Sequence, residues 1–216
     1  MIAIDLHTHS TASPDGGLRA EDYDRMFAHN SLHVVAVTDH NSIQMALVLH
    51  KKFGERIIIG EEVMAQEGEI IGLYLHKAIP AGLSAVATAQ AIKQQGGLVY
   101  IPHPFETVRK GLPLAVLNTI IDAVDIIETR NGRAIFQKYD KQAVAWSQAY
   151  YKPGAASSDA HGRHGWGKTY SQISAMPSRE TLVKLLQTAQ YSHAFPGVRA
   201  ILYPKYNRLK VKKNHA

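Results

Sequence analysis

The chain has 216 residues, of which 45% are hydrophobic and 19% charged, a length and composition typical of one globular domain. It contains no cysteine, which excludes disulfides and thiolate metal ligands, and no apolar run approaches the roughly 18 residues that a membrane span needs. The net charge is +6, and residues 201–216 hold five basic residues and no acid, so the rest of the chain is nearly neutral.

This charge distribution predicts two regions, a domain over residues 1–200 and a basic C-terminal tail over 201–216. Such a tail is typically a solvated, poorly ordered end, and the alternative is a contact for an anionic partner such as nucleic acid. The first ten residues include a predicted strand and do not resemble a secretory leader. We therefore expect a soluble, cytoplasmic protein that does not bind membranes.

Strand-like and helical segments alternate along the chain. Strands are expected at residues 2–6, 33–38, 56–62, 69–75, 98–102, 124–129, 154–158 and 170–177. Helices are expected at residues 19–30, 42–53, 84–95, 133–150 and 179–190, with Ser84 and Ser178 as caps at the start of two of them. The alternating order predicts an α/β domain with a parallel sheet, and no linker or internal repeat divides it.

Metal-capable side chains follow several of these strands. His7 and His9 are two residues apart, so they point to the same side of a strand, and Asp159 and His161 repeat this spacing near the other end of the chain. The full set of candidate ligands is His7, His9, Asp15, His40, Glu62, Glu69, His103, Asp159 and His161. A closed or nearly closed barrel brings strand ends to one cleft, whereas a flat sheet spreads them apart. The set therefore predicts a multinuclear metal site in a barrel.

In this order the motifs resemble the polymerase and histidinol phosphatase (PHP) superfamily of metal-dependent phosphoesterases, over nearly the whole chain. The motifs are DLHTHS at 5–10, SPDG at 13–16, VTDHN at 37–41, GEE at 60–62, IPHPF at 101–105 and SSDAHG at 157–162. The resemblance implies a distorted (β/α)7 TIM-like barrel with two or three divalent ions.

The resemblance also assigns the ligands. A first ion would take His7, His9, Glu62 and Asp159; a second would share Glu62 and add His103; a third would lie between Asp15, His40 and His161. Imidazole and carboxylate ligands suit Mn²⁺, Zn²⁺ or Fe²⁺, with Mg²⁺ also compatible.

Three ligand positions have alternatives. Related sequences often carry a histidine where this chain has Glu69; Glu69 is favoured as the second ion's further ligand and His76 is its rival. Glu61 replaces Glu62 if the strand register differs by one residue. Asp15 caps the turn in SPDGG if it is not a ligand.

Substrate oxygens need cationic donors, and the basic residues in loops after the predicted strands are Arg130, Arg133, Arg163, His164 and Lys168. Arg133 is the preferred phosphate-binding residue, and His164 is the preferred proton donor to a leaving alkoxide. Both assignments are hypotheses about spatial proximity.

The expected activity is hydrolysis of a phosphate ester by attack of a metal-bound hydroxide, on a nucleotide, a short oligonucleotide or a small phosphate monoester. Two alternatives remain, a metal-dependent amidohydrolase, which also begins with an HxH motif, and a non-catalytic metal-binding module.

Overall fold

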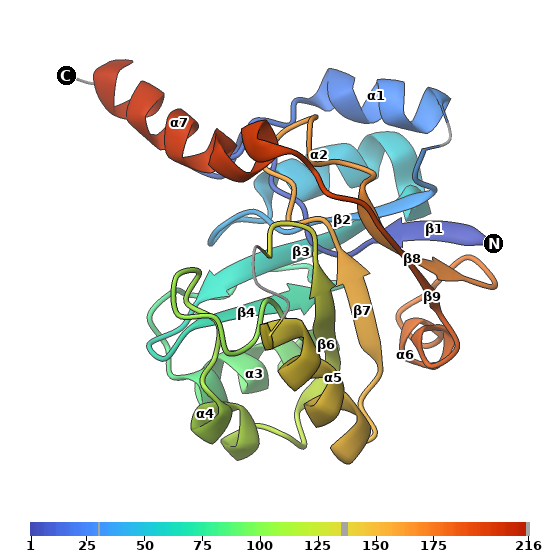
Figure 1. Cartoon of the computed structure of the whole chain (residues 1–216), viewed down its shortest axis with the longest axis vertical. Coiled ribbons are helices and arrows are strands. Elements are labelled where there is room, and N and C mark those ends of the chain that lie inside the picture. Colours follow the sequence, from blue (N-terminus) through green and yellow to red (C-terminus); the bar gives the residue numbers. More distant parts are fainter. Residues whose placement is uncertain (30, 135–137, 215–216) are drawn as a thin grey trace.

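A computed structural model describes residues 1–29, 31–134 and 138–214 (Figure 1). Its strands are β1 (Ile2–Asp5), β2 (Val34–Val37), β3 (Ile57–Met64), β4 (Glu69–Leu73), β5 (Leu98–Ile101), β6 (Val124–Asn131), β7 (Gly154–Ser157), β8 (Thr169–Ile173) and β9 (Gln190–His193). All the predicted strands are present, and β9 is an additional one that the alternation of apolar residues did not indicate.

The helices are α1 (Ala20–Ala28), α2 (Gln44–Phe53), the short 3-10 helix η1 (Gly54–Arg56), α3 (Ala85–Gln94), α4 (Leu114–Thr119), α5 (Lys138–Ala149), α6 (Leu182–Leu186) and α7 (Val198–Asn214). Helix α3 begins where the sequence predicts, because the Ser84 hydroxyl accepts a hydrogen bond from the Ala87 amide at 3.2 Å. Of the helix predicted over 133–150, residues 135–137 lie outside the described residues. The last predicted helix is shorter than expected, since α6 covers only five residues.

The strands form one sheet in the order β7-β6-β5-β4-β3-β2-β1-β8-β9. The expectation of a purely parallel sheet is wrong at two places. Strand β4 runs antiparallel to both β3 and β5, and β8 and β9 add antiparallel pairs beside β1. The physical reason is the short link between β3 and β4, which forms a hairpin and leaves no room for a crossover helix.

The sheet curves into a nearly closed barrel, which confirms the α/β barrel predicted for a single domain. The chain just after β1 meets the chain just after β7 through a parallel bridge between Thr8 and Ala160, where the His9 amide donates to the Ala160 carbonyl at 2.9 Å. Lower in the barrel, the Ala156 amide of β7 donates to the Ser171 hydroxyl of β8 at 2.9 Å. The segments that carry His7, His9, Asp159 and His161 are therefore neighbours in space.

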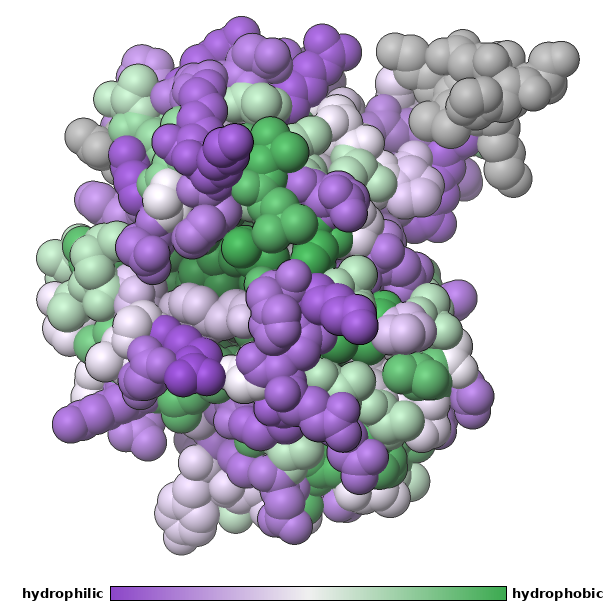
Figure 2. Space-filling model, turned by 180° about the vertical axis from the view of Figure 1, so that it is seen from behind, coloured by the Kyte–Doolittle hydropathy of each residue, from purple (hydrophilic) through white to green (hydrophobic). Residues whose placement is uncertain are grey.

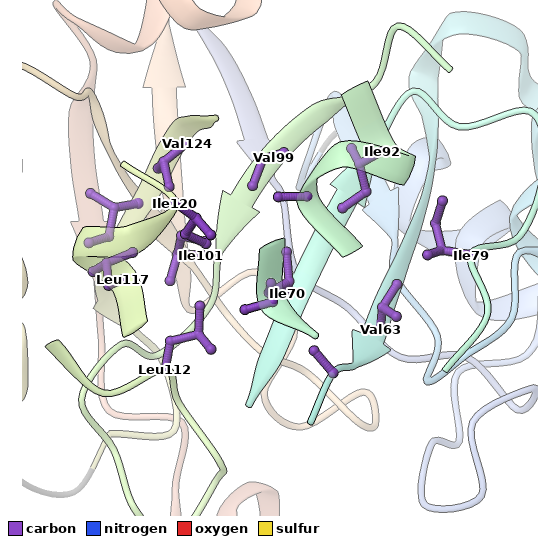
Figure 3. Close-up of a cluster of buried hydrophobic side chains, with 14 of the residues drawn as sticks. Val63, Ile70, Ile79, Ile92, Val99, Ile101, Leu112, Leu117, Ile120 and Val124 are labelled. Atoms are coloured by element: carbon purple, nitrogen blue, oxygen red, sulfur yellow. The ribbon is translucent and has the colours of Figure 1, made fainter. Parts of the chain in front are cut away.

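Buried apolar side chains occupy the barrel and both of its flanks. One cluster takes residues such as Ile4, Ile71 and Tyr100 from strands around the barrel interior. Two others lie outside it, one under α1 and α2 and one between strands β4 to β6 and helices α3 to α5. Figure 3 shows the last of these, where Ile92 of α3 and Leu117 of α4 lie in one layer with strand residues. This packing holds the strand ends rigidly in place.

The face shown in Figure 2 is mainly hydrophilic, with a smaller hydrophobic area near its middle. Within the described ranges, no helix combines the length and the apolar character that crossing a lipid bilayer requires.

The C-terminal region differs from the expected poorly ordered tail. Residues 198–214 form helix α7, which extends away from the barrel in Figure 1. It is anchored at the loop after β1, where the side-chain amide of Asn207 donates to the carbonyls of Asp15 and Gly16 at 3.2 and 2.9 Å. This long-range contact explains why the sequence alone did not indicate order here.

Candidate metal centre

Glu62 of β3 lies at the middle of the gathered side chains. Its Oε1 atom is 3.3 Å from Nε2 of His7 and 3.1 Å from Nε2 of His103. Its Oε2 atom is 3.3 Å from Nε2 of His9 and 3.1 Å from Nδ1 of His40. Each carboxylate oxygen thus faces two imidazoles, the arrangement expected of a carboxylate that bridges two cations.

The neighbouring Glu61 points the other way, since alternate residues of a strand face opposite sides. Its Oε2 atom accepts a hydrogen bond from the Ile79 amide at 2.8 Å. Of the two candidates the structure therefore brings Glu62, and not Glu61, to the cluster.

The direction of β4 decides between Glu69 and His76. Glu69 is the first residue of β4, and because β4 is antiparallel, this start lies at the same edge as the carboxyl ends of the parallel strands. Its carboxylate is 3.6 Å from Nε2 of His103 and 3.8 Å from Nδ1 of His40. His76 follows the opposite end of β4 and is exposed. Glu69 therefore reaches the cluster from the first residue of an antiparallel strand, whereas other candidate residues lie at or after the ends of parallel strands.

Asp159 completes a group with the first two histidines. Its Oδ1 atom lies 3.6 Å from Nε2 of both His7 and His9, whose own Nε2 atoms are 3.1 Å apart. Asp159 and His103 both have positive φ angles, 50° and 27°. Such backbone is uncommon for residues other than glycine and is concentrated at functional sites.

A further group joins Asp15, His40 and His161. Oδ1 of Asp15 is 3.6 Å from Nε2 of His40 and 3.5 Å from Nε2 of His161. This oxygen is buried and has no hydrogen-bond partner among the described residues. The carboxylate thus faces two imidazoles, which is the arrangement that the predicted ligand role of Asp15 requires.

Buried charges in this centre favour added positive charge. Burial, together with the neighbouring carboxylates Glu62 and Asp159, raises the pKa of Glu69 to about 9. Burial opposes protonation of His7, but Asp159, Glu62 and Glu128 outweigh it and hold the His7 pKa well above its usual range. Carboxylates crowded in this way are stabilised by cations between them.

The surroundings of two other histidines favour the neutral form of imidazole, which is the form that binds metals. Burial and the positive Arg133 lower the pKa of His161 to about 4, and burial with the nearby His161 and His40 holds the His9 pKa well below its usual range. Ligand atoms lie within 4.8 Å of one another in four overlapping groups: His9, His40 and His161; His7, Glu62 and His103; His7, His9 and Asp159; His40, Glu62 and Glu69. This donor set and the unpartnered Asp15 oxygen fit divalent cations.

Buried residues that the sequence did not single out contact these candidate ligands. Glu128 of β6 accepts from the Tyr100 hydroxyl at 2.8 Å and from the His103 amide at 2.6 Å, and its Oε1 lies 3.3 Å from Nδ1 of His7. Asp39 accepts from the Ser13 hydroxyl at 2.7 Å, and that hydroxyl is 3.0 Å from Nδ1 of His9. The sequence signal that could have indicated Glu128 is its position as an acidic residue inside the apolar run VDIIET. Partners of this kind fix the ring orientation of metal-binding histidines.

A cavity of about 310 Å³ opens above the centre. Cationic side chains line it beside the candidate ligands: Arg109, Lys110, Arg133 and Arg208. Arg133 is the residue the sequence favoured, and its Nη1 lies 3.2 Å from Oδ1 of Asp159. Arg109 was missed; it donates to Oδ2 of Asp159 at 2.8 Å from a loop eight residues beyond β5. Arg208 was treated only as part of the tail.

The structure does not bring His164 to this cavity. His164 and Arg163 are exposed and line a separate cavity of about 490 Å³ beside α1, because the glycine-rich turn after His161 carries them away from the ligands. Arg130 pairs with Asp140 at 3.2 Å, and Lys168 is exposed outside both cavities. A loop position after a strand does not define where its side chain lies.

Two proteins of Methanocaldococcus jannaschii, both described as uncharacterised, are similar in sequence. One is 37% identical over 138 residues, which cover 58% of this chain and 81% of the relative. The other is 30% identical over 180 residues, which cover 81% of this chain and 72% of the relative. No family model matches the chain.

Solved structures with a similar fold are about 15% identical in sequence to this chain. A two-domain Bacteroides vulgatus protein, described as containing a predicted PHP-like metal-dependent phosphoesterase, has a TM-score of 0.73 and 16% identity, over 96% of this chain and 69% of that one. PsfC from Pseudomonas syringae has a TM-score of 0.66 and 15% identity, over 99% and 98%. An amidohydrolase from Chromobacterium violaceum has a TM-score of 0.58 and 15% identity, over 73% and 87%. The chain therefore belongs to one family with the two archaeal proteins, and its fold is similar to that of a protein described as containing a predicted PHP-like metal-dependent phosphoesterase.

Proposed function

We propose that this protein is a metal-dependent phosphoesterase whose substrate is a nucleotide, a short oligonucleotide or a small phosphate monoester. The observation that carries the proposal is the position of Glu62, which faces four imidazoles at the base of a cavity lined by cationic side chains. Divalent ions held close together by such ligands supply a nucleophilic water near neutral pH and stabilise the attacking and leaving oxygens at phosphorus.

The cationic residues support a phosphate substrate. Arg133 is only about one-sixth exposed, and together with Arg109 it faces the ligand Asp159. Guanidinium groups match the geometry of phosphate oxygens, and their charge is effective in a partly buried cavity. A neutral amide or lactone gains little from these charges, so they favour phosphoester hydrolysis over amidohydrolase activity. The cavity volume suits a small ester.

The residues also support a choice of cofactor. Glu69 makes the ligand set richer in oxygen than an all-histidine site, which favours Mn²⁺ or Mg²⁺ over Zn²⁺. We propose two or three such ions. Replacing Glu69 with alanine is expected to weaken Mn²⁺ binding, whereas His76→Ala, beyond the other end of the same strand, is expected to leave it unchanged.

The test is hydrolysis of a panel of phosphate monoesters, nucleotides and short oligonucleotides with Mn²⁺ supplied, beside a panel of amides and lactones. Hydrolysis of at least one substrate is expected, measured as phosphate release from the monoesters and as shorter products from the oligonucleotides. Arg133→Ala is expected to lower kcat/KM by about 100-fold, because a preorganised donor to the phosphate is lost. Arg130→Ala is the matched control, since Arg130 pairs with Asp140 outside the cavity.

Two outcomes contradict the proposal. Hydrolysis of amides or lactones without any phosphoester hydrolysis would identify an amidohydrolase. No turnover in either panel by protein shown to be loaded with metal would identify a non-catalytic metal-binding module.

A further inference from the structure

Helix α7 packs tightly against the loop that carries Asp15. A Cβ atom at Gly17 would lie 2.4 Å from the Tyr203 hydroxyl oxygen, and one at Gly162 would lie 2.9 Å from the Tyr203 ring. Glycine at both positions therefore allows Tyr203 to lie between the loop after β1 and the loop after β7. Asn207, one turn further along, donates to the Asp15 and Gly16 carbonyls.

Arg208 follows Asn207 and reaches the Asp15 carboxylate itself. Its Nε donates to Oδ2 of Asp15 at 2.8 Å, and its Nη2 donates to the same oxygen. Both bonds go to one oxygen, so the other, Oδ1, is turned toward His40 and His161. That oxygen is buried without a hydrogen-bond partner among the described residues, which is costly for a carboxylate unless a cation lies beside it.

We propose that Arg208 is a positioning residue that holds Asp15 as the ligand of the cation between Asp15, His40 and His161. This inference rests on the proposed function. In this proposal the C-terminal helix α7, which follows the last strand of the barrel, supplies a side chain that orients one of the candidate cation ligands.

The charge of Arg208 does not argue against this role. The Arg208 side chain is 62% exposed and lies on the solvent side of the carboxylate, so water and salt screen its repulsion of a cation. Asp15 is 2% exposed, and the orientation of its buried oxygen is the larger effect. Loss of a group that orients a metal ligand typically weakens metal binding about 10- to 100-fold.

The experiment measures Mn²⁺ binding by calorimetry and bound Mn²⁺ by elemental analysis, with no turnover assay. Asp15→Ala first identifies which binding event belongs to this position. Arg208→Ala is expected to weaken that event about 10- to 100-fold and to leave the others unchanged. Arg208→Lys keeps the positive charge but lacks the planar guanidinium group with its several donors. It is expected to restore only part of the Mn²⁺ affinity. Lys205→Ala, an exposed cation on the same helix, is the matched control and is expected to bind as wild type.

The double variant Asp15→Ala with Arg208→Ala tests the route of the effect. If Arg208 acts through Asp15, the double variant binds Mn²⁺ as Asp15→Ala does. Unchanged or tighter binding in Arg208→Ala, with its helical content retained by circular dichroism, overturns the inference. If Arg208→Ala loses helical content, Asn207→Ala is measured instead, because it removes the neighbouring anchor of α7. Asn207→Ala is then expected to weaken the Mn²⁺ binding event that Asp15→Ala identifies. If that binding event is unaffected, the inference is overturned. A wild-type protein that binds no Mn²⁺ contradicts the proposed function instead, so the two failures are distinguishable.

Discussion

Glu61 and Glu62 are adjacent in sequence, but their side chains lie on opposite sides of β3, and only Glu62 is part of the candidate metal centre. The carboxylate of Glu62 faces four imidazoles, and that of Glu61 binds the Ile79 amide on the other side of β3. The pattern GEE predicts the pair, and the family motif favours Glu62. Only the strand register assigns each side chain to its side.

Glu62→Gln is expected to reduce phosphoester turnover by about 100-fold or more and to lower the bound Mn²⁺, because the amide removes the negative charge that two cations would share. Turnover and metal content of the purified variant are the measurements. Glu61→Gln is the control at the adjacent position and is expected to retain both. Equal losses in the two variants would mean that the substitution disturbs β3 as a whole.

Glu61 also gives a prediction for stability against pH. Burial raises the pKa of Glu61 to about 7 from an ordinary value of 4.5. Between these values the folded protein holds a proton that the unfolded chain has lost, so its stability falls as the pH rises through this window. Glu61→Gln removes the cost of ionisation, on the order of 3 kcal/mol for a pKa shift of this size. Urea unfolding is expected to show the variant more stable than wild type at pH 8 and similar to it at pH 5; a pH-independent difference would contradict this assignment.

Residues that act from a distance in sequence were not predictable. Arg109 lies in a loop well beyond β5, and Arg208 reaches Asp15 across 193 positions of the chain. Conversely, His164 is near His161 in sequence and yet lines another cavity. Most candidate ligands were easier to predict because they stand at or just after the end of an apolar strand, where the fold fixes their position; Asp15 and Glu69 are the exceptions.

At the scale of elements, apolar runs predicted where strands occur but not their direction. The run EIIGL has the same appearance in a parallel or an antiparallel strand, and the short link from β3 decides the direction of β4. Helix α7 was missed for another reason. Its order is accompanied by contacts of Tyr203, Asn207 and Arg208 with loops near the start and the end of the barrel, which no local periodicity reveals.

The start of α3 shows that a local signal can be sufficient. Ser84→Ala is expected to lower the free energy of unfolding by about 1 kcal/mol, because the cap of the Ala87 amide is lost. Chemical denaturation measures this change. Gln90→Ala, on the exposed side of the same helix, is the control and is expected to stay within about 0.5 kcal/mol of wild type. A cost below that limit for Ser84→Ala would show that packing alone fixes this helix end.

At the scale of the whole molecule, the barrel brings acidic and imidazole groups from many strands into one buried place. Ion binding is therefore expected to stabilise the fold. Mn²⁺ at a hundred times its Kd contributes about 2.7 kcal/mol for one site, which corresponds to a rise in Tm of about 5–10 °C for a chain of this size. Thermal unfolding with Mn²⁺ and then with excess chelator is the measurement. A Tm that does not respond to either would contradict a metal centre of useful affinity.

The most direct test of the central claim is anomalous X-ray diffraction from crystals of the protein loaded with Mn²⁺. The account predicts at least two anomalous peaks on either side of the Glu62 carboxylate, with ligand distances of about 2.0–2.3 Å to imidazoles and carboxylates of the cluster. Peaks confined to the molecular surface, or none beside Glu62 when the ion is in excess, would contradict it.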